Sequence, residues 1–254
     1  MLAFQPKDTK RLIAAALGNV ENDLAIEGCR IFNVFTKEFL EATVYICDGF
    51  ISHVEYNKKN SALPSKQRLQ LNGILCPGFI DAHTHIESSL LVPEHYAAMV
   101  LPHGTTTVLE DAHEIANVMG VEGIQYMLAA SQDLPMRMLL TLPSCVPSLP
   151  GFESSNAELF AKDYTALFQH PRVAGLGEVM DYEGVLQGEQ RIHDLLLAAK
   201  KHAGYLQGHA PLMEGNRLSA YVNAGPQSDH EVKTKQEALD KYRKGMWIDI
   251  REAN

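Results

Sequence analysis

A pair of histidines at the end of an apolar segment is the most chemically informative motif of this sequence. His83 and His85 lie two residues apart within D-A-H-T-H-I-E, where a strand over residues 74–83 is expected. Side chains alternate along a strand, so both imidazoles project from one face and can bind one metal ion. Asp81 and Glu87 share that face. A motif this short also occurs by chance, and ordinary structural histidines explain it about equally well.

Three further residues with metal-binding side chains follow later apolar segments. Glu178 lies in GLGEVM, His209 in YLQGHAP and His230 in PQSDHE. Each alone fits a solvated or hydrogen-bonded residue. Parallel barrels, however, assemble their active sites at the carboxyl ends of their strands, and these residues occupy matching positions on successive expected strands. The coincidence favours one shared site.

The donor set indicates the kind of metal and its chemistry. Three or four imidazoles with a carboxylate suit Zn²⁺, Mn²⁺ or Fe²⁺, whereas Ca²⁺ and Mg²⁺ prefer oxygen ligands. Such an ion lowers the pKa of bound water toward about 7 and so supplies hydroxide at neutral pH. Glu178 can bridge two ions. The set therefore predicts a two-metal hydrolytic site.

The segment GTTTVLEDAHE places more polar side chains near this centre. Glu110, Asp111 and His113 lie at the end of the next expected strand and, with Glu178, are the candidate catalytic residues. Groups beside a metal centre commonly orient its ligands and the substrate. Acidic residues that favour a helix N-terminus explain Asp111 and Glu114 nearly as well. The remaining histidines are interpreted as structural: His53, His95, His103, His170, His193 and His202.

A scaffold of repeated βα units would position these residues. Apolar runs alternate with helical patterns at intervals of about 25 to 35 residues, which is typical of a parallel sheet. We expect strands at residues 74–83, 104–111, 137–146, 173–180, 204–210, 224–230 and 246–250. We expect helices at residues 93–102, 113–131, 154–169, 188–203, 214–223 and 235–244. The sequence thus predicts an α/β fold, a (β/α)8-type (TIM-like) barrel over residues 74–254.

Residues 1–73 predict a separate, small β-rich domain. Residues 24–56 form short apolar runs with a polar turn at Thr36–Glu38 and a hairpin signal at Asp48-Gly49. A polar surface loop is expected from Asn57 to Arg68. We expect the thin core of this domain to contain Ile26, Ile31, Val44 and Ile46.

Composition narrows the functional class. A formal net charge of −9 without a basic stripe argues against nucleic-acid binding and favours a small neutral or cationic substrate. The four cysteines form no C-x-x-C pair, so a reducing cytoplasm is expected. No window approaches the roughly 18 apolar residues of a membrane span, and residues 1–18 do not resemble a signal peptide.

The expected barrel is incomplete at its C-terminal end. A full barrel of this type needs about 250 residues, whereas roughly 178 remain from Pro77 onward. We therefore expect no eighth βα unit. Uncovered strand edges favour association, so a homo-oligomer is expected.

Several longer motifs resemble the adenine deaminase family of the amidohydrolase superfamily. They are PGFIDAHTHIESSLLVPEHYA, HGTTTVLEDAHEIANVMG, GLGEVMDYEGVL, GHAPLMEGNRLSAYVNAG and SDHE, in the family's order and over almost the whole length. The resemblance implies a distorted barrel beside a small β domain. It also implies conversion of adenine and water to hypoxanthine and ammonia, as in purine salvage and adenine catabolism, with two manganese or iron ions. Zinc is common elsewhere in the superfamily.

The same resemblance assigns roles to the metal-binding residues. It implies that His83 and His85 bind the first ion, Glu178 bridges, and His209 and His230 bind the second. Members of the family have a further aspartate after an eighth strand, which Asp249, expected inside the seventh strand, does not replace. We expect the chain as given to deaminate adenine about 10²- to 10⁴-fold more slowly than a chain extended through that strand, because a proton-transfer group contributes that much.

Two other interpretations remain open. Another amidohydrolase, such as a cyclic amide hydrolase of the dihydroorotase kind, shares H-x-H but does not account for EDAHEIANVMG. A catalytically weak metal-binding fragment is the other. The zinc deaminases with H-x-E and P-C-x-x-C signatures are set aside, because neither arrangement is present.

Overall fold

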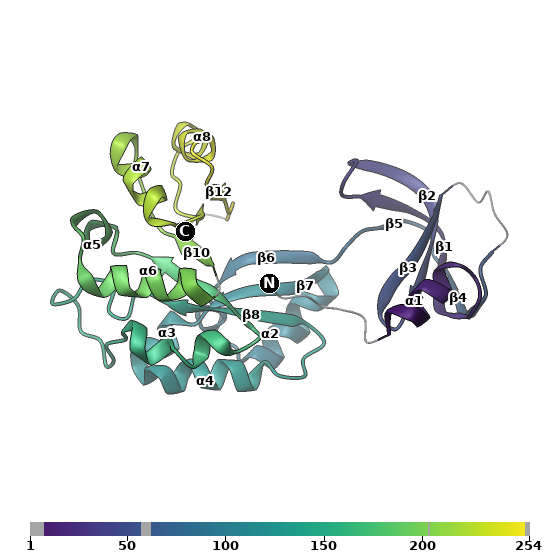
Figure 1. Ribbon diagram of the computed structural model, residues 1–254, viewed down its shortest axis with the longest axis horizontal. Helices are drawn as coiled ribbons and strands as arrows, with labels where there is room; N and C mark the ends of the chain where they lie inside the picture. Colours follow the sequence, from purple (N-terminus) through teal and green to yellow (C-terminus); the bar gives the residue numbers. More distant parts are fainter. Residues whose placement is uncertain (1–7, 57–61, 203, 252–254) are drawn as a thin grey trace. The chain divides into compact units, whose positions relative to one another are not determined.

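The computed structural model describes residues 8–56, 62–202 and 204–251, and the chain forms two compact units (Figure 1). The smaller unit ends at Pro77 and the larger begins at Gly78. The sequence pattern predicts this boundary at residue 73. The difference arises because β5 (Ile74–Leu75), expected as the start of the first barrel strand, pairs with β1 of the smaller unit.

The smaller unit is a β-sheet with one short helix. It contains α1 (Thr9–Ala16), β1 (Asn22–Asn33), β2 (Glu38–Cys47), β3 (Phe50–Tyr56) and β4 (Ser65–Gln70), in the strand order β3-β2-β1-β4 with β5 also on β1. Asp48 and Gly49 both have positive φ, 53° and 76°, as a tight hairpin turn between β2 and β3 requires. Ile31 and Val44 are buried in its own apolar cluster, with Ile26 and Ile46 packed against them.

One prediction for this unit is wrong. Residues 57–61 of the expected surface loop lie outside the described residues, but Ser65–Gln70 form strand β4, parallel to β1. The side chains of β4 are mostly exposed and polar, so the sequence contains no alternation to signal a strand. Strand β4 forms because its backbone pairs with one side of β1. A polar sequence is usual for such an edge strand.

The larger unit is built on a parallel sheet. Its strands are β6 (Phe79–Thr84), β7 (Thr105–Asp111), β8 (Arg137–Pro143), β9 (Val173–Val179) and β10 (Tyr205–Gly208), in spatial order β10-β9-β8-β7-β6. Each strand pairs in parallel with the next. The last two expected strands, β11 (Ser228–Asp229) and β12 (Trp247–Ile248), form a separate parallel pair. The predicted α/β fold, an incomplete barrel with a small β unit, is confirmed.

Helices follow the strands as the pattern predicted, with differences in detail. They are η1 (Ile86–Ser89), α2 (Pro93–Val100), η2 (Leu101–His103), α3 (His113–Met119), α4 (Val121–Ala130), α5 (Tyr182–Gln187), α6 (Gln190–His202), α7 (Gly215–Ala224) and α8 (Lys235–Arg243). The expected helix 113–131 is broken at Gly120, whose φ of 61° is not helical. The last residue of the expected helix 188–203 lies outside the described residues.

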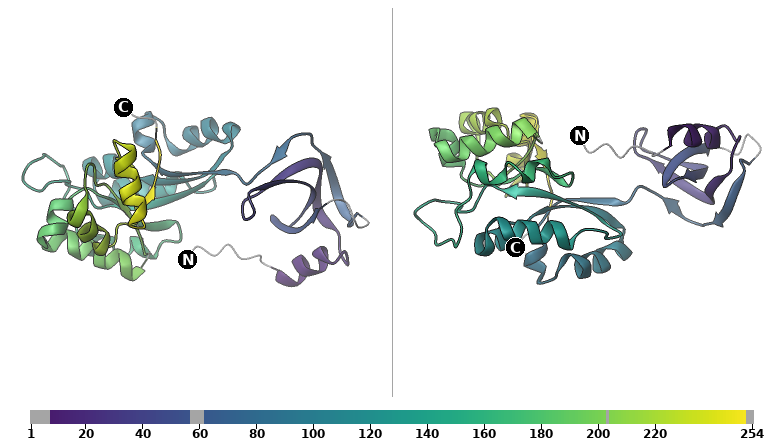
Figure 2. Two further views of the ribbon diagram at one scale, coloured as in Figure 1. Left: turned by 90° about the horizontal axis from the view of Figure 1, so that it is seen from above. Right: turned by 60° about the horizontal axis from the view of Figure 1, so that its bottom comes forward.

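The arrangement of these helices is visible in the figures. Helices α2, α3 and α4 lie together along one side of the sheet (Figure 1). The yellow-green segment that contains α7, β11, α8 and β12 follows β10 and can be traced from two further directions in Figure 2. No helix within the described ranges is long and apolar enough to cross a membrane.

The predicted α-helix over residues 154–169 is wrong. That segment contains only two short 3-10 turns, η3 (Ala161–Tyr164) and η4 (Leu167–Gln169). Its backbone N–H groups bond to distant carbonyls, with Asn156 donating to Asn117 and Leu159 to Val146. Leu159, Tyr164, Leu167 and Phe168 are buried. The apolar spacing that resembled a helix therefore reflects core packing of an irregular segment.

Candidate metal centre

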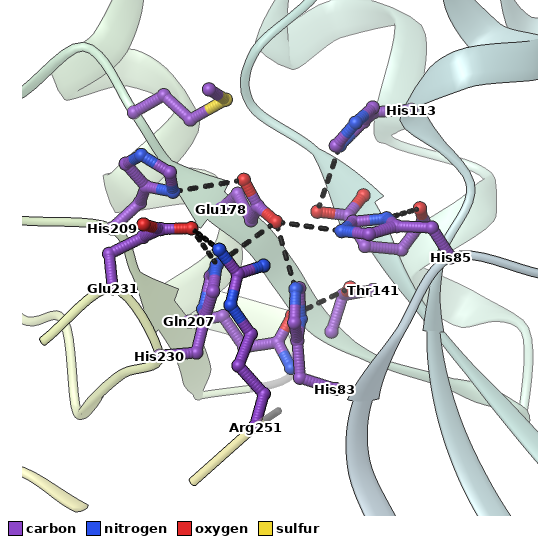
Figure 3. A network of polar contacts seen from close by, with 12 residues as sticks. His83, His85, His113, Thr141, Glu178, Gln207, His209, His230, Glu231 and Arg251 are labelled. Carbon is purple, nitrogen blue, oxygen red and sulfur yellow. Dashed lines mark hydrogen bonds and ion pairs between the residues drawn. The ribbon is translucent and has the colours of Figure 1, made fainter. Parts of the chain in front are cut away.

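Five side chains meet at the carboxyl ends of the parallel strands. His83 is the second-last residue of β6 and His85 lies just beyond it, Glu178 lies on β9, His209 follows β10, and His230 follows β11. Figure 3 shows all four imidazoles turned toward the Glu178 carboxylate. Because strands β6 to β10 run in one direction, their carboxyl ends share one edge of the sheet. The structure thus brings together every residue that the sequence proposed as a metal ligand.

The distances are short enough for a shared site. His83 Nε2 and His85 Nε2 both lie 2.9 Å from Glu178 Oε1. His230 Nε2 is 3.3 Å from the same oxygen, and His209 Nδ1 is 3.2 Å from Glu178 Oε2. The rings are also packed closely, with the His83 and His230 centroids 3.9 Å apart.

Hydrogen bonds to carbonyl oxygens fix the orientation of two imidazoles. His85 Nδ1 lies 2.9 Å from the backbone oxygen of Asp111, and His83 Nδ1 lies 3.4 Å from Gln207 Oε1. Both oxygens are acceptors only, so each Nδ1 carries the proton. Each Nε2 is then the ring atom that faces Glu178 and the centre. Metal-binding histidines are generally oriented in this way.

Two of the three remaining candidate catalytic residues also reach the centre. Asp111 and His113 form, with Glu178, a further group whose potential ligand atoms lie within 4.8 Å of one another. His113 Nδ1 is 3.7 Å from Asp111 Oδ2, and the His113 ring lies 4.4 Å from that of His85. Glu110 points to the other side of β7. There it is fully buried and accepts a hydrogen bond from the Ile86 N–H.

Burial and charge shift the pKa values of these groups strongly. Burial acts to raise the pKa of Glu178, but the close contacts of its carboxylate with the imidazoles of His209, His230, His83 and His85 outweigh burial and lower the pKa well below its usual range. Burial raises the pKa of Glu110 well above its ordinary value, and the neighbouring Glu87 adds to that effect.

His85 gives a prediction about pH and stability. Burial acts to lower its pKa, but Glu178 and Asp111 outweigh burial and raise it from 6.5 to about 9. A raised pKa means that the folded state binds the proton more tightly, so this stabilisation is complete below about pH 6.5 and disappears as the pH rises through about 9. We expect the unfolding free energy of metal-free protein to fall by at most about 3 kcal/mol over that range.

Urea unfolding of chelator-treated protein at pH 6 and pH 9.5 would measure the change. His85→Asn should flatten the dependence, because it removes the titrating group. An unfolding free energy that stays constant or rises with pH in the unmodified protein would contradict the assignment.

Gly177 makes room for the Asp111 carboxylate. A Cβ at this position would lie 2.4 Å from Asp111 Oδ2 and 2.6 Å from Thr141 Oγ1. We expect Gly177→Ala to lower the unfolding free energy by about 1–3 kcal/mol, the usual cost of overpacking. Asp111→Ala removes one of the two obstructing groups, so the same change should cost less in that background. Equal costs in the two backgrounds would show that Asp111 is not the obstructing group.

Gln207, Glu231 and Arg251 lie at the centre although the sequence does not predict them as site residues, and Asp249 lies differently from its expected place. Gln207 is fully buried and donates through Nε2 to the Ala82 carbonyl, 2.9 Å away. Glu231 lies beside His230 and forms an ion pair with Arg251, and both are drawn in Figure 3. Asp249 was expected inside a strand, but it follows β12, and its Oδ2 is buried without a partner among the described residues. Strand-end position was the available signal for Gln207 and Asp249.

The cluster fits divalent metal ions. Buried polar atoms normally have hydrogen-bond partners. Here His83 Nε2, His209 Nδ1, His230 Nδ1 and both Asp111 carboxylate oxygens make no hydrogen bond within the described residues. Imidazole nitrogens and carboxylate oxygens left free at one point are the donors that borderline divalent ions require.

A fourth group of potential ligands, Asp23, Cys47 and Asp48, lies in the smaller unit. Its carboxylates are already neutralised, because Arg11 pairs with both Asp23 and Asp48 and Lys66 Nζ lies 2.8 Å from Asp23 Oδ1. The group is therefore explained as a surface ion-pair network.

The larger unit is a parallel β/α sheet with imidazoles and a carboxylate at the carboxyl ends of its strands. This combination defines a barrel-type metal-binding protein. The chain belongs to the amidohydrolase family, whose sequence model matches residues 74–254. This family is metal-dependent.

Curated relatives agree with the resemblance found in the motifs. "Adenine deaminase 2" of Carboxydothermus hydrogenoformans is 41% identical over 250 residues, which cover 98% of this chain and 42% of the relative. "Adenine deaminase" of Dehalococcoides mccartyi (strain CBDB1) is 43% identical over 246 residues, which cover 96% of this chain and 42% of the relative. The resemblance to adenine deaminases is confirmed, and the chain spans about two fifths of the length of these relatives.

Solved structures agree on the fold. A mutant of atrazine chlorohydrolase TrzN from Arthrobacter aurescens TC1, complexed with zinc and atraton, superposes with a TM-score of 0.63 at 17% identity. The match covers 89% of this chain and 64% of that one. At this identity the likeness is informative about the fold alone.

Proposed function

We propose that this chain contributes the metal-binding part of an adenine deaminase, which hydrolyses adenine to hypoxanthine and ammonia in purine salvage. One observation carries the proposal: four imidazoles surround the buried Glu178 carboxylate at the edge of the sheet where barrel enzymes hold their sites. The names of relatives that match nearly the whole chain supply the substrate.

We assign the metal ligands by the two groups of potential ligand atoms that include Glu178. His83 and His85 would hold one ion, His209 and His230 the other, and Glu178 would be shared between them. Manganese or iron is proposed and zinc also suits these donors. When bound, such ions activate water and stabilise negative charge that develops on the substrate.

The chain's own residues have three tasks in this proposal. Gln207 and the Asp111 carbonyl hold the imidazoles of His83 and His85 in the ligand orientation. Asp111 and His113 bind the purine and transfer a proton to the departing amine, since they lie next to Glu178 and have free polar atoms. Glu110 positions the turn after His85 through its bond to the Ile86 N–H.

We also propose a cytoplasmic homo-oligomer whose partner is a small purine and neither nucleic acid nor a membrane. Exposed apolar residues on β6, the edge strand of the sheet, support self-association: Phe79 is 59% and Ile80 70% exposed. Gel filtration at several protein concentrations would test this, and a monomer at every concentration would contradict it.

Metal analysis combined with ammonia release from adenine tests the proposed function. We expect two ions per chain after manganese loading, and ammonia and hypoxanthine formed in equal amounts. Dihydroorotate is the comparison substrate, because a cyclic amide hydrolase would open it. Opening of dihydroorotate without release of ammonia from adenine would contradict the proposal.

A further inference from the structure

A buried lysine lies behind the second proposed metal site. Lys241, on α8, is fully buried in a chain whose core is otherwise largely apolar. Lysine is rarely buried unless its ammonium group is paired. Its Nζ donates to the Ala210 carbonyl at 2.6 Å, to Glu237 Oε1 at 2.6 Å and to the Asp229 carboxylate. All three donor positions of the ammonium are therefore used.

Two partners of this ammonium are linked directly to metal-binding histidines. Ala210 follows His209 directly in the chain, and Asp229 directly precedes His230. Lys241 thus bridges the backbone after one histidine and the side chain before the other.

Asp229 strengthens this connection between the two segments. Its Oδ1 accepts from the Ala210 N–H at 3.1 Å and from the Glu231 N–H at 3.2 Å. Ala210 and Glu231 are the residues that follow His209 and His230. One carboxylate therefore holds both turns, while its other oxygen binds Lys241.

Glu237 makes a second pair of such bonds from α8. Its Oε1 accepts from the Leu212 N–H at 2.7 Å and its Oε2 from the Lys233 N–H at 2.9 Å. Through Asp229 and Glu237 the cluster anchors four backbone N–H groups, two after each histidine.

The charge of the cluster explains why Lys241 is needed. Asp229 and Glu237 are both buried, and two carboxylates would repel each other without a cation between them. An apolar contact would hold α8 in place with less desolvation. A hydrogen-bonded network instead fixes the direction and spacing of the segments that it joins.

We propose that Lys241, with Asp229 and Glu237, is a positioning residue for the second metal site and sets the separation of His209 and His230. The inference rests on the proposed function. His209 and His230 lie 3.2 Å and 3.3 Å from Glu178, and a small displacement of either turn would lengthen the contact of its own histidine. His83 and His85 come from another part of the sheet, and Gln207 and the Asp111 carbonyl, rather than α8, orient their rings.

Metal titration of the full chain tests the proposal without using adenine turnover. Lys241→Met keeps the length of the side chain and removes its charge and donors. We expect its second Zn²⁺ to bind about 10- to 100-fold more weakly, the usual effect of losing a group that orients a metal ligand. The first Zn²⁺ should bind as before. Lys235→Met, which changes an exposed lysine on the same helix, is the matched control and should bind both ions normally.

A second variant tests the proposal if Lys241→Met does not fold. Asp229→Asn/Lys241→Met removes one buried negative charge together with the positive one, and the amide that replaces the carboxylate still offers an oxygen to both N–H groups. It should show the same weak second site. If either folded variant binds the second Zn²⁺ with an affinity within about threefold of that of the unmodified chain, the proposal is overturned, because loss of an orienting group lowers metal affinity about 10-fold or more.

An unmodified chain that binds both ions tightly but releases no ammonia would instead count against the proposed function alone.

Discussion

Glu178→Gln is expected to remove the paired metal ions and to lower adenine turnover at least about 10³-fold, within the range that a directly participating catalytic group contributes. Each group of potential ligands in the larger unit includes a Glu178 oxygen. A neutral amide offers only one acceptor oxygen, and its NH₂ group would face an imidazole nitrogen instead of accepting from it. Bridging of two cations then fails for reasons of both charge and geometry.

Elemental analysis after manganese loading, together with ammonia release, would measure both effects. Glu183→Gln is the matched control, because Glu183 is on the next helix, is half exposed and pairs with Arg217 at the surface. It should retain two ions and normal turnover. A Glu178→Gln protein that still holds two ions would refute the bridging role.

The same residue shows how much of the centre the sequence could predict. Strand-end positions identified Glu178 and four histidines correctly as neighbours. For Glu178, His83, His85 and His209 the reason is that parallel strands of one sheet place their carboxyl ends on one edge, whereas His230 follows β11 of the separate β11–β12 pair. The sequence did not separate Glu110 from Asp111. Alternation along β7 allows only one of two adjacent side chains to face the centre, and the structure shows that it is Asp111.

Other features depend on tertiary context that no local pattern contains. Glu237 and Lys241 are four residues apart on a polar helix, a spacing that normally indicates an exposed ion pair. Their burial follows from Asp229 and the turns after β10 and β11, which meet α8 only in the folded chain. Residues 154–169 carry helical apolar spacing, yet core packing and distant backbone partners override it.

The two histidine pairs of the centre are held in place by different elements. His83 and His85 are oriented by Asp111 and Gln207, which belong to the main sheet. His209 and His230 are held by α8 and the short β11–β12 pair. Metal affinity at the two sites should therefore respond separately to substitutions, whereas Glu178 affects both.

His113→Asn is expected to lower adenine turnover by about 10²- to 10⁴-fold while two metal ions remain bound, since this is the usual contribution of a proton-transfer group. His113 is not needed to complete either histidine pair around Glu178. Its Nδ1 faces the buried Asp111 carboxylate at 3.7 Å, so it can exchange a proton there. His95→Asn, at an exposed position on α2, is the control and should leave turnover unchanged.

Bound metal and turnover must be measured on the same preparations, because His113 has a second possible role. If His113→Asn loses a metal ion along with activity, His113 is a ligand and the proton-transfer assignment is wrong. If two ions remain and turnover is also unchanged, the proton passes through another group, and Asp249 and Glu231, whose carboxylates both interact with His230, are the candidates. Asp111→Asn should resemble His113→Asn, and combining the two changes should add little further loss, because paired groups that act as a unit are strongly non-additive.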